Sequence, residues 1–443
     1  MDQKRFDELL AEHGVPGATL AVLAGDEVHA LASGILNLDT GVEATTDSMF
    51  QLASITKAYT ATVFMRLVEQ GLATLDTPVV GVLPDFKVAD AGVTRHVTMR
   101  HLLTHTSGIG GDFFEGSWRG DDCVERYVAT LAEVTQDVPL GAAPSYSNTG
   151  FCILGRVVEV LTGLTWDQAI ATYIREPLGL THTWTLPEEV IRFRTAMGHL
   201  TTSATDTPKT APLWEFPLRG MGPCGAVSAT ASDVIAFARM HLTDPALAGM
   251  REPQVAIPGP LVDAWGLGWM LWTWDGREVF GHSGDNYGQT AHLVAVPDAG
   301  VAIALMANVD RFARFQRAVF GELLRELCGI QMPPAPTPPD EPFEIAGDPA
   351  RYTGTYERFG ARVEITLGAD DRSLRSTETR TEALADLIPP HTLDLVPVAH
   401  DAFVAWLANS ERWTPVTFTD GPDGERLVYL GIRAAVKTPQ PAA

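Results

Sequence analysis

The chain has 443 residues, of which 45% are hydrophobic and 20% are charged, and this composition excludes a collagen, a coiled coil and a disordered chain. Its 32 Lys and Arg residues and 55 Asp and Glu residues give a formal net charge of −23, which disfavours binding to nucleic acid or to an anionic membrane. No apolar run approaches the ~18 residues of a membrane span, and the first ten residues lack the apolar core of a signal peptide, so we expect a cytoplasmic protein. The four cysteines lie far apart, which predicts free thiols rather than a zinc site or a disulfide scaffold.

The first three quarters of the chain mix strands with helices. Residues 18–34 alternate around a Gly-Asp turn and predict a β-hairpin. Residues 54–70 are apolar on nearly every side, which predicts a buried helix that ends at Gly71, and residues 150–161 predict another. Residues 265–307 predict a meander of three or four strands. This order of elements, with strands first, helices in the middle and strands last, is typical of an α+β fold.

A proline-rich segment divides the chain. Residues 331–342 read QMPPAPTPPDEP, and these prolines forbid a helix interior and favour an extended linker. We therefore predict one domain over residues 1–330 and a second over residues 343–443. The second domain has short strands separated by turns, which predicts an antiparallel sandwich or barrel. Its expected strands are 352–357, 362–366, 392–397, 402–407, 414–419 and 426–432.

The first candidate for chemistry is the motif Ser54-Ile55-Thr56-Lys57, at the start of the predicted buried helix. A serine and a lysine three residues apart lie on one face of a helix, and the free N–H groups at the helix start favour negative charge on the serine oxygen. A lysine inside an apolar helix is costly to charge, so it is a candidate base for the serine. The chain has few lysines, which makes this one more notable than a chance Ser-x-x-Lys.

Two further motifs each allow a structural and a functional interpretation. The run Tyr146-Ser147-Asn148 either caps the helix that follows or places a phenol and an amide on one side of an extended segment. The run GHSGD at 281–285 forms either a turn with an exposed histidine or an edge that a substrate approaches closely. The sequence has no H-E-x-x-H motif, P-loop, dinucleotide-binding motif or Gly-x-Ser-x-Gly motif.

The three motifs follow one another in a fixed order, each on the expected kind of element. With the runs HLLTHTSG at 101–108 and GPCGAVSATASD at 222–233, the sequence resembles the class C β-lactamase-type serine hydrolases, a group related to penicillin-binding proteins. The resemblance covers residues 5–328. Residues 343–437, with the run YTGTY at 352–356, resemble the lipocalin-like β-barrel that some members carry. The implied fold is α+β, a β-lactamase/transpeptidase-like antiparallel sheet with a helical region, plus a small all-β barrel.

The resemblance implies a role for each motif residue. Ser54 would be the nucleophile that forms an acyl-enzyme, and Lys57 and Tyr146 would form its proton relay. Asn148 would hold the amide on the acyl side. The backbone N–H groups of Ser54 and Asp285 would form the oxyanion hole. No metal and no organic cofactor is implied, and water or an amine would complete turnover.

The third motif departs from the pattern of true β-lactamases. They carry Lys-Thr-Gly where this chain has His282-Ser283-Gly284, on the edge expected to bind substrate. A lysine is permanently charged and can pair with the carboxylate of a β-lactam, whereas a histidine is mostly neutral at pH 7. The motif therefore points away from β-lactam hydrolysis, and we expect His282 to affect substrate choice more than chemistry.

Three functional hypotheses follow. The first is a serine hydrolase of an ester or amide, such as an esterase, an amidase or a D-amino-acid peptidase. The alternative is an acyltransferase or peptide cyclase, similar to the penicillin-binding-protein-type thioesterases of nonribosomal peptide synthesis, which passes the acyl group to an amine or alcohol. The third is a binding protein that reuses the fold, which the intact set of Ser54, Lys57 and Tyr146 disfavours. The first two imply a small-molecule or peptide acyl substrate as the partner.

Other conspicuous side chains have simpler interpretations. His101 and His105 are predicted to pack and to hydrogen-bond in loops rather than to catalyse. Four tryptophans in the meander are predicted to pack in the core, namely Trp265, Trp269, Trp272 and Trp274. Candidates for an apolar acyl pocket are Phe113, Phe114, Trp118, Trp214, Phe216 and Met221.

Overall fold

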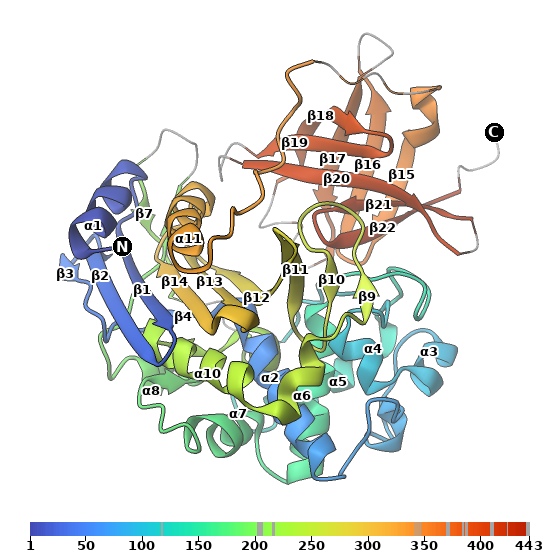
Figure 1. Cartoon of the computed structure of the whole chain (residues 1–443). Coiled ribbons are helices and arrows are strands. Elements are labelled where there is room, and N and C mark those ends of the chain that lie inside the picture. Colours follow the sequence, from blue (N-terminus) through green and yellow to red (C-terminus); the bar gives the residue numbers. More distant parts are fainter. Residues whose placement is uncertain are drawn as a thin grey trace.

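The computed structural model describes the chain except for Ser117 and residues 202–206, 215–217, 342, 344, 346, 369–372, 383–384, 386–388, 408–411, 423 and 440–443. Figure 1 shows a large sheet with helices on both faces and a barrel at one side of it. This mixed architecture confirms the predicted α+β fold with a small all-β barrel.

The large sheet joins the two ends of the first domain. Strands β1 and β14 pair in antiparallel register, with Leu20 opposite Leu305. The predicted hairpin at 18–34 and the predicted meander at 265–307 both lie in this sheet, which confirms them. In the described part of the chain its strands, in order, are β3 (Val42–Glu43), β2 (Glu27–Asn37), β1 (Gly17–Ala24), β14 (Val301–Ala307), β13 (Gln289–Val296), β12 (Arg277–Asn286), β11 (Met270–Trp274), β10 (Ala264–Trp265) and β9 (Val255–Ala256).

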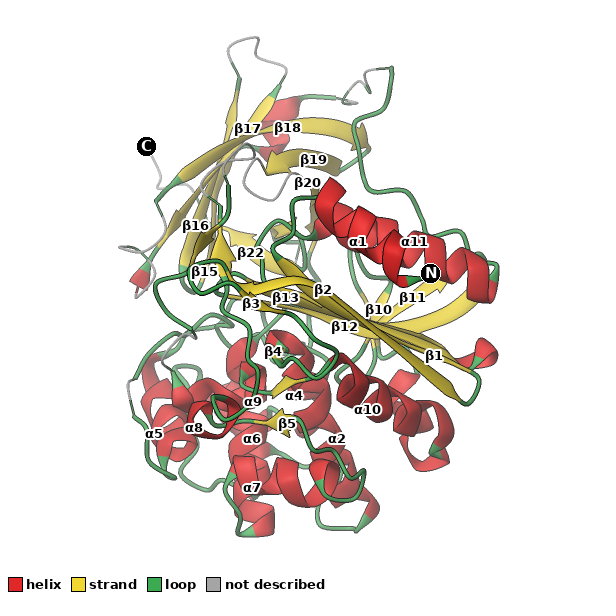
Figure 2. Cartoon of the chain, turned by 90° about the vertical axis from the view of Figure 1, so that its left-hand side faces the viewer, coloured by secondary structure: helices red, strands yellow, loops and turns green. Residues whose placement is uncertain are grey.

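Helices cover both faces of this sheet (Figure 2). On one face α1 (Gln3–Glu12) and α11 (Ala313–Cys328) bury an apolar layer that includes Phe6 and Phe315. On the other face lie α10 (Ala231–Thr243) and a helical region with short strands β4 (Phe50–Gln51), β8 (Ser228–Ala229) and β5 (Thr183–Trp184). The remaining helices there are α2 (Thr56–Glu69), α3 (Ala91–His96), α4 (Met99–Leu103), α5 (Cys123–Ala129), α6 (Asn148–Thr162), α7 (Trp166–Ile170), α8 (Pro187–Val190) and α9 (Gly222–Gly225).

The two helices predicted from apolar periodicity are present. Helix α2 is buried along most of its length, as expected of a helix that is apolar on nearly every side. Helix α6 ends at Gly163, which takes the left-handed conformation (φ 71°) that favours glycine. Among the described residues no single helix is long and apolar enough to cross a membrane; α6 and the segment Trp166–Arg175 pass that test only as a pair bent by 78°.

The second body is a closed eight-stranded barrel, whose strands are β15 (Gly354–Arg358), β16 (Ala361–Leu367), β17 (Leu374–Arg380), β18 (His391–Ala399), β19 (Ala402–Leu407), β20 (Arg412–Asp420), β21 (Arg426–Leu430) and β22 (Arg433–Lys437). The sequence predicted only six of them. Strand β17 was missed because it is mostly polar, although Leu374, Ser376 and Glu378 alternate into the buried side. The predicted strand at 426–432 covers β21 and the two-residue turn after it, and strand β22, which begins at Arg433, was missed.

Two hairpin tips of the barrel touch the first domain. At the β15–β16 tip, Phe359 N donates to Asp137 Oδ1 at 2.6 Å. At the β21–β22 tip, Ile432 O accepts from Tyr146 N at 3.1 Å. Of the predicted linker, residues 331–341 lie in no helix or strand, and residue 342 lies outside the described residues. The barrel therefore meets the first domain at the segment that carries the Tyr-x-Asn motif.

Candidate active site

Ser54 lies in a tight turn just before helix α2. The turn is a 3-10 helix over Ala53–Ile55, and α2 continues from Thr56. Ala53 has φ 45°, in the left-handed region that non-glycine residues rarely occupy. Strained backbone of this kind persists only where the surroundings hold it, and it clusters at functional sites. The turn presents Ser54 to a cavity rather than to the core.

Lys57 lies one helical turn further on and is fully buried. Its Nζ is 3.0 Å from Ser54 Oγ and donates to the carbonyl oxygen of Cys224 at 2.9 Å. The predicted Ser-x-x-Lys pair is therefore within hydrogen-bond distance, as a nucleophile and its base must be. The carbonyl of Cys224 fixes the direction of the amine.

Tyr146 lies against this pair at the start of helix α6. Lys57 Nζ is 4.8 Å from the centroid of its ring. Ser147 caps the helix by accepting from Gly150 N at 3.0 Å, so the capping interpretation of this run holds together with the placement of Tyr146 at the site. Asn148, the first residue of α6, lines the same cavity.

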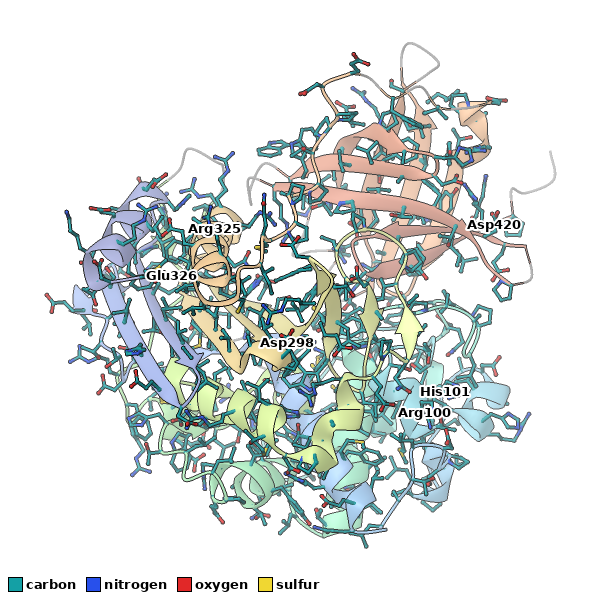
Figure 3. The ribbon with its side chains drawn as sticks, viewed as in Figure 1. Arg100, His101, Asp298, Arg325, Glu326 and Asp420 are labelled. Carbon is teal, nitrogen blue, oxygen red and sulfur yellow. The ribbon has the colours of Figure 1, made fainter. Side chains whose placement is uncertain are left out.

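Two buried rings support Tyr146 from behind. The centroid of the His105 ring is 4.6 Å from that of Tyr146, and the Trp265 centroid is 5.8 Å from it. His105 Nδ1 accepts from Ser147 N at 3.0 Å, and burial together with Lys57 holds the pKa of His105 well below its usual value. His101 caps helix α4 through Thr98 and lies outside the cavity lining (Figure 3). Both histidines thus have the packing and hydrogen-bonding places predicted for them.

Strand β12 closes the site on the side of the sheet. A methyl group on Gly284 would lie 2.1 Å from Leu52 O and 2.8 Å from Ser54 N, so only glycine allows this strand to approach the Ser54 turn. Asp285, the next residue, lines the cavity with Ser54. This placement is compatible with the predicted oxyanion hole, whose role stays a prediction.

His282 differs from its expected place on the substrate-binding edge. Its side chain is buried and is not part of the cavity lining, although its ring packs near Tyr146, which does line the cavity, and near Trp265. Its Nδ1 donates to Ser283 O at 2.6 Å. Burial first, and Lys57 second, lower the pKa of His282 to about 3, so it is neutral at pH 7. Alternation along β12 explains the difference, because Ser283 and Asp285 face the cavity instead.

The cavity around Ser54 has a volume of ≈ 370 Å³, within the range of small-ligand sites. Of the residues predicted for an apolar pocket, Phe114 and Met221 line it, whereas Trp214 bonds to Ala196 O elsewhere. Phe216 lies outside the described residues. Leu218 and Met270 add apolar surface.

The barrel supplies part of the cavity wall. Ile432 and Arg433, at the β21–β22 tip, line the cavity together with Ser54. The Arg433 guanidinium carbon is 4.9 Å from the centroid of the Tyr146 ring. Sequence reasoning missed both residues because they begin an ordinary short strand and no local pattern marks them.

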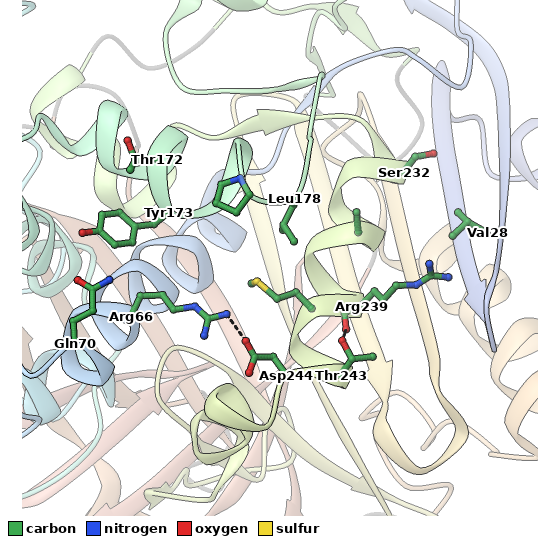
Figure 4. Close-up of a pocket in the computed structure, with 13 residues that line it drawn as sticks. Val28, Arg66, Gln70, Thr172, Tyr173, Leu178, Ser232, Arg239, Thr243 and Asp244 are labelled. Carbon is green, nitrogen blue, oxygen red and sulfur yellow. Dashed lines mark hydrogen bonds and ion pairs between the residues drawn. The ribbon is translucent and has the colours of Figure 1, made fainter.

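A larger cavity of ≈ 980 Å³ lies between α2, α10 and the segment around Tyr173 (Figure 4). An ion pair between Arg66 and Asp244 crosses it. None of the motif residues lines it, so its size does not make it the catalytic site. Among the described residues, no three His, Cys, Asp or Glu side chains are grouped so as to hold a metal ion.

Comparisons with known proteins agree with this geometry. The sequence model of the family described as Beta-lactamase matches residues 3–324. Penicillin-binding protein 4 of Amycolatopsis lactamdurans is 48% identical over 373 residues, which cover 81% of this chain and 97% of that protein. The crystal structure of SurE superposes with a TM-score of 0.79 at 27% identity and covers 98% of each chain. D-amino acid amidase of Ochrobactrum anthropi SV3 superposes with a TM-score of 0.59 at 26% identity, over 69% of this chain and 90% of that one. The chain therefore belongs to the Beta-lactamase family of serine hydrolases.

Proposed function

We propose that this protein is a serine acyl-enzyme hydrolase that acts on an ester or amide through Ser54, Lys57 and Tyr146. The observation that supports it most is the 3.0 Å contact between Lys57 Nζ and Ser54 Oγ at the wall of a cavity. A hydroxyl next to a buried amine has an acceptor for its proton, which is what makes serine a nucleophile.

The reaction divides into two steps. Ser54 Oγ attacks the substrate carbonyl and its proton passes to the Lys57–Tyr146 relay, which returns a proton to the leaving amine or alcohol as the ester bond to Ser54 forms. Water then attacks the acyl-enzyme, gives a proton to the relay and releases the acid, and Ser54 regains its proton. Backbone N–H groups at Ser54 and Asp285 stabilise the oxyanion in both steps.

The acyl group is proposed to end in a D-amino acid residue. SurE has also been solved with D-Leu, which supports this proposal, whereas the D-amino acid amidase has been solved with both D-phenylalanine and L-phenylalanine. The lining of the cavity suits an apolar side chain, since Phe114, Met221 and Met270 lie there. The site has no lysine at the third motif to pair with a substrate carboxylate, which favours neutral esters and amides over β-lactams.

Transfer of the acyl group to an amine is the second candidate. The barrel closes one side of the cavity with Ile432, and the apolar wall that it completes limits the access of water to an acyl-enzyme. An amine bound in the same cavity would then compete with water.

The test uses p-nitrophenyl esters of N-acetyl-D-leucine and N-acetyl-L-leucine. We expect release of p-nitrophenol with a higher kcat/KM for the D-ester, and no release by Ser54→Ala beyond the uncatalysed rate. Equal rates for the two esters would contradict the D-acyl assignment, and equal rates for parent and Ser54→Ala would contradict the hydrolase itself. Addition of an amine, followed by product analysis, separates hydrolysis from transfer.

A further inference from the structure

Asp112 lies at the junction of the two domains, in the loop that precedes helix α5. It is buried, and its carboxylate has partners from three separate elements. Asn148 Nδ2 donates to Oδ1 at 3.2 Å, Arg433 Nη2 donates to Oδ1 at 3.0 Å, and Arg358 Nη1 donates to Oδ2 at 3.0 Å. One partner belongs to the Tyr-x-Asn motif and the other two belong to the barrel.

The charge of Asp112 depends on the barrel. Burial alone would raise the pKa of its carboxyl, but Arg433 and Arg358 outweigh burial and hold that pKa well below its usual range. A buried carboxylate is strongly unfavourable unless it is paired and hydrogen-bonded. Because both arginines come from the barrel, Asp112 is satisfied as a charged group only when the barrel is docked.

The same barrel tips hold the backbone next to the motif. Ile432 O accepts from Tyr146 N, and Ala434 N donates to Ser145 Oγ at 3.2 Å. The Arg433 guanidinium also lies over the Tyr146 ring, which Lys57 Nζ approaches as well. The Tyr146–Asn148 segment is thus held at its backbone, at its phenol ring and, through Asp112, at its amide.

The loop that carries Asp112 is fixed independently of the arginines. Asn148 N donates to Gly111 O at 3.0 Å, and Gly111 N donates to Asp137 Oδ2 at 3.2 Å. Asp137 in turn accepts from Phe359 N of the other barrel tip. The carboxylate of Asp112 is therefore held in place by neighbours that remain when one of its partners is changed.

We propose that Asp112 is a positioning residue that ties the amide of Asn148 to Arg433 and Arg358, so that docking of the barrel sets the orientation of the catalytic segment against Ser54 and Lys57. The inference rests on the proposed function, because it concerns the same site. Its consequence is that the barrel contributes to the rate of acylation and not only to the wall of the cavity.

The test is a double-mutant cycle between Asp112→Asn and Asn148→Ala, read out as the rate at which a fluorophosphonate phosphonylates Ser54 with loss of fluoride, and as kcat and KM for a p-nitrophenyl ester. Asp112→Asn keeps the size of the side chain and removes its charge. We expect it to lower the phosphonylation rate and kcat about 10- to 100-fold, as a misplaced catalytic group does, with KM nearly unchanged. In the Asn148→Ala background the same change should have little further effect, because the two residues act through one contact.

The matched control is Asp394→Asn, which removes a carboxylate from an exposed ion pair with Arg375 on the outside of the barrel and should leave both rates unchanged.

Independent, additive losses in the cycle would overturn the inference, and so would a normal phosphonylation rate of folded Asp112→Asn. If Asp112→Asn does not fold, Arg433→Lys in the same cycle provides the test, since it keeps the charge but loses the planar fork that pairs with a carboxylate. If the parent itself is not labelled at Ser54, the proposed function fails and this inference fails with it, whereas a labelled parent with additive losses overturns this inference alone.

Discussion

The catalytic domain and the barrel hold their buried basic side chains in different ways. In the catalytic domain, Lys57 lies within an apolar helix, and its Nζ contacts Ser54 Oγ and Cys224 O of the same domain. At the end of the barrel, Arg358 and Arg433 are held by a carboxylate, Asp112, that lies across the domain boundary. We propose that the first arrangement activates a nucleophile and that the second holds the two domains in one orientation.

This difference separates the groups proposed to carry out the reaction from the groups that orient the two domains. The groups that we propose to attack the substrate and to move protons all belong to the catalytic domain, on elements that its own core positions. Among the described residues, the barrel reaches the site through hairpin tips, where it touches Tyr146 and Asp112. Changes in the catalytic domain should therefore abolish activity, whereas changes at the barrel interface should weaken it or alter its dependence on pH.

The largest effect is expected for Tyr146→Phe, which keeps the ring beside Lys57 and Arg433 and removes only the hydroxyl. Loss of an acid–base group should lower turnover of a p-nitrophenyl ester by at least about 100-fold. Circular dichroism and thermal unfolding should match the parent, since the ring contacts remain. Turnover close to that of the parent would remove Tyr146 from the relay.

Gly284→Ala should disrupt the contact between strand β12 and the nucleophile turn. The added methyl group would meet the backbone at Leu52 O and Ser54 N, so strand or turn must move. We expect the free energy of unfolding to fall by about 1–3 kcal/mol, as at other overpacked sites, and the acylation of Ser54 to become slower. Gly321→Ala in α11 is the matched control, because nothing lies within 4 Å of its added methyl group. Equal behaviour of the two variants would contradict the close approach.

At the barrel interface, Asp137 should make stability depend on pH. Burial raises its pKa to about 6, against the smaller opposing effects of Arg358 and of the N–H groups of Phe359 and Gly111. A raised acid pKa favours the neutral form in the fold, so this contribution is present below pH 3.8 and is lost as pH rises through about 6. Asp137→Asn cannot ionise, so its free energy of unfolding should rise relative to that of the parent by about 1–3 kcal/mol as pH rises from below 3.8 to above 6. At every pH its amide NH2 replaces one of the two oxygens that accept from Gly111 N and Phe359 N.

Denaturant unfolding of the parent and Asp137→Asn at pH 5 and pH 7.5 measures this effect. The difference between the two proteins should grow towards the higher pH. A difference that is the same at both pH values would show that Asp137 does not titrate at the interface.

The smallest effect is expected on the outer surface of the barrel. Arg375 and Asp394 form an exposed ion pair at 2.8 Å between strands β17 and β18. Exposed ion pairs contribute about 0–1 kcal/mol to stability. Asp394→Asn should therefore lower the free energy of unfolding by at most about 1 kcal/mol and leave the activity unchanged. A large loss of activity would mean that the barrel acts on the site by more than its two tips.

The catalytic segments could be predicted because their signals are local. Ser54 and Lys57 share one helical turn, and Tyr146 and Asn148 flank a helix cap, so spacing alone brings each pair together. Asp112, Arg358 and Arg433 could not be predicted, because their contacts join residues up to 321 positions apart. His282 was expected among the substrate-binding residues, whereas its buried ring is not part of the cavity lining, to which Ser283 and Asp285 of the same strand contribute.

The most direct test of the central claim is the intact mass of the parent and of Ser54→Ala after incubation with a fluorophosphonate. We predict one adduct on the parent and none on the variant, because the Lys57 amine lies beside Ser54 Oγ and is proposed to activate that hydroxyl. Adducts on both proteins, or on neither, would contradict the assignment of Ser54 as the activated nucleophile.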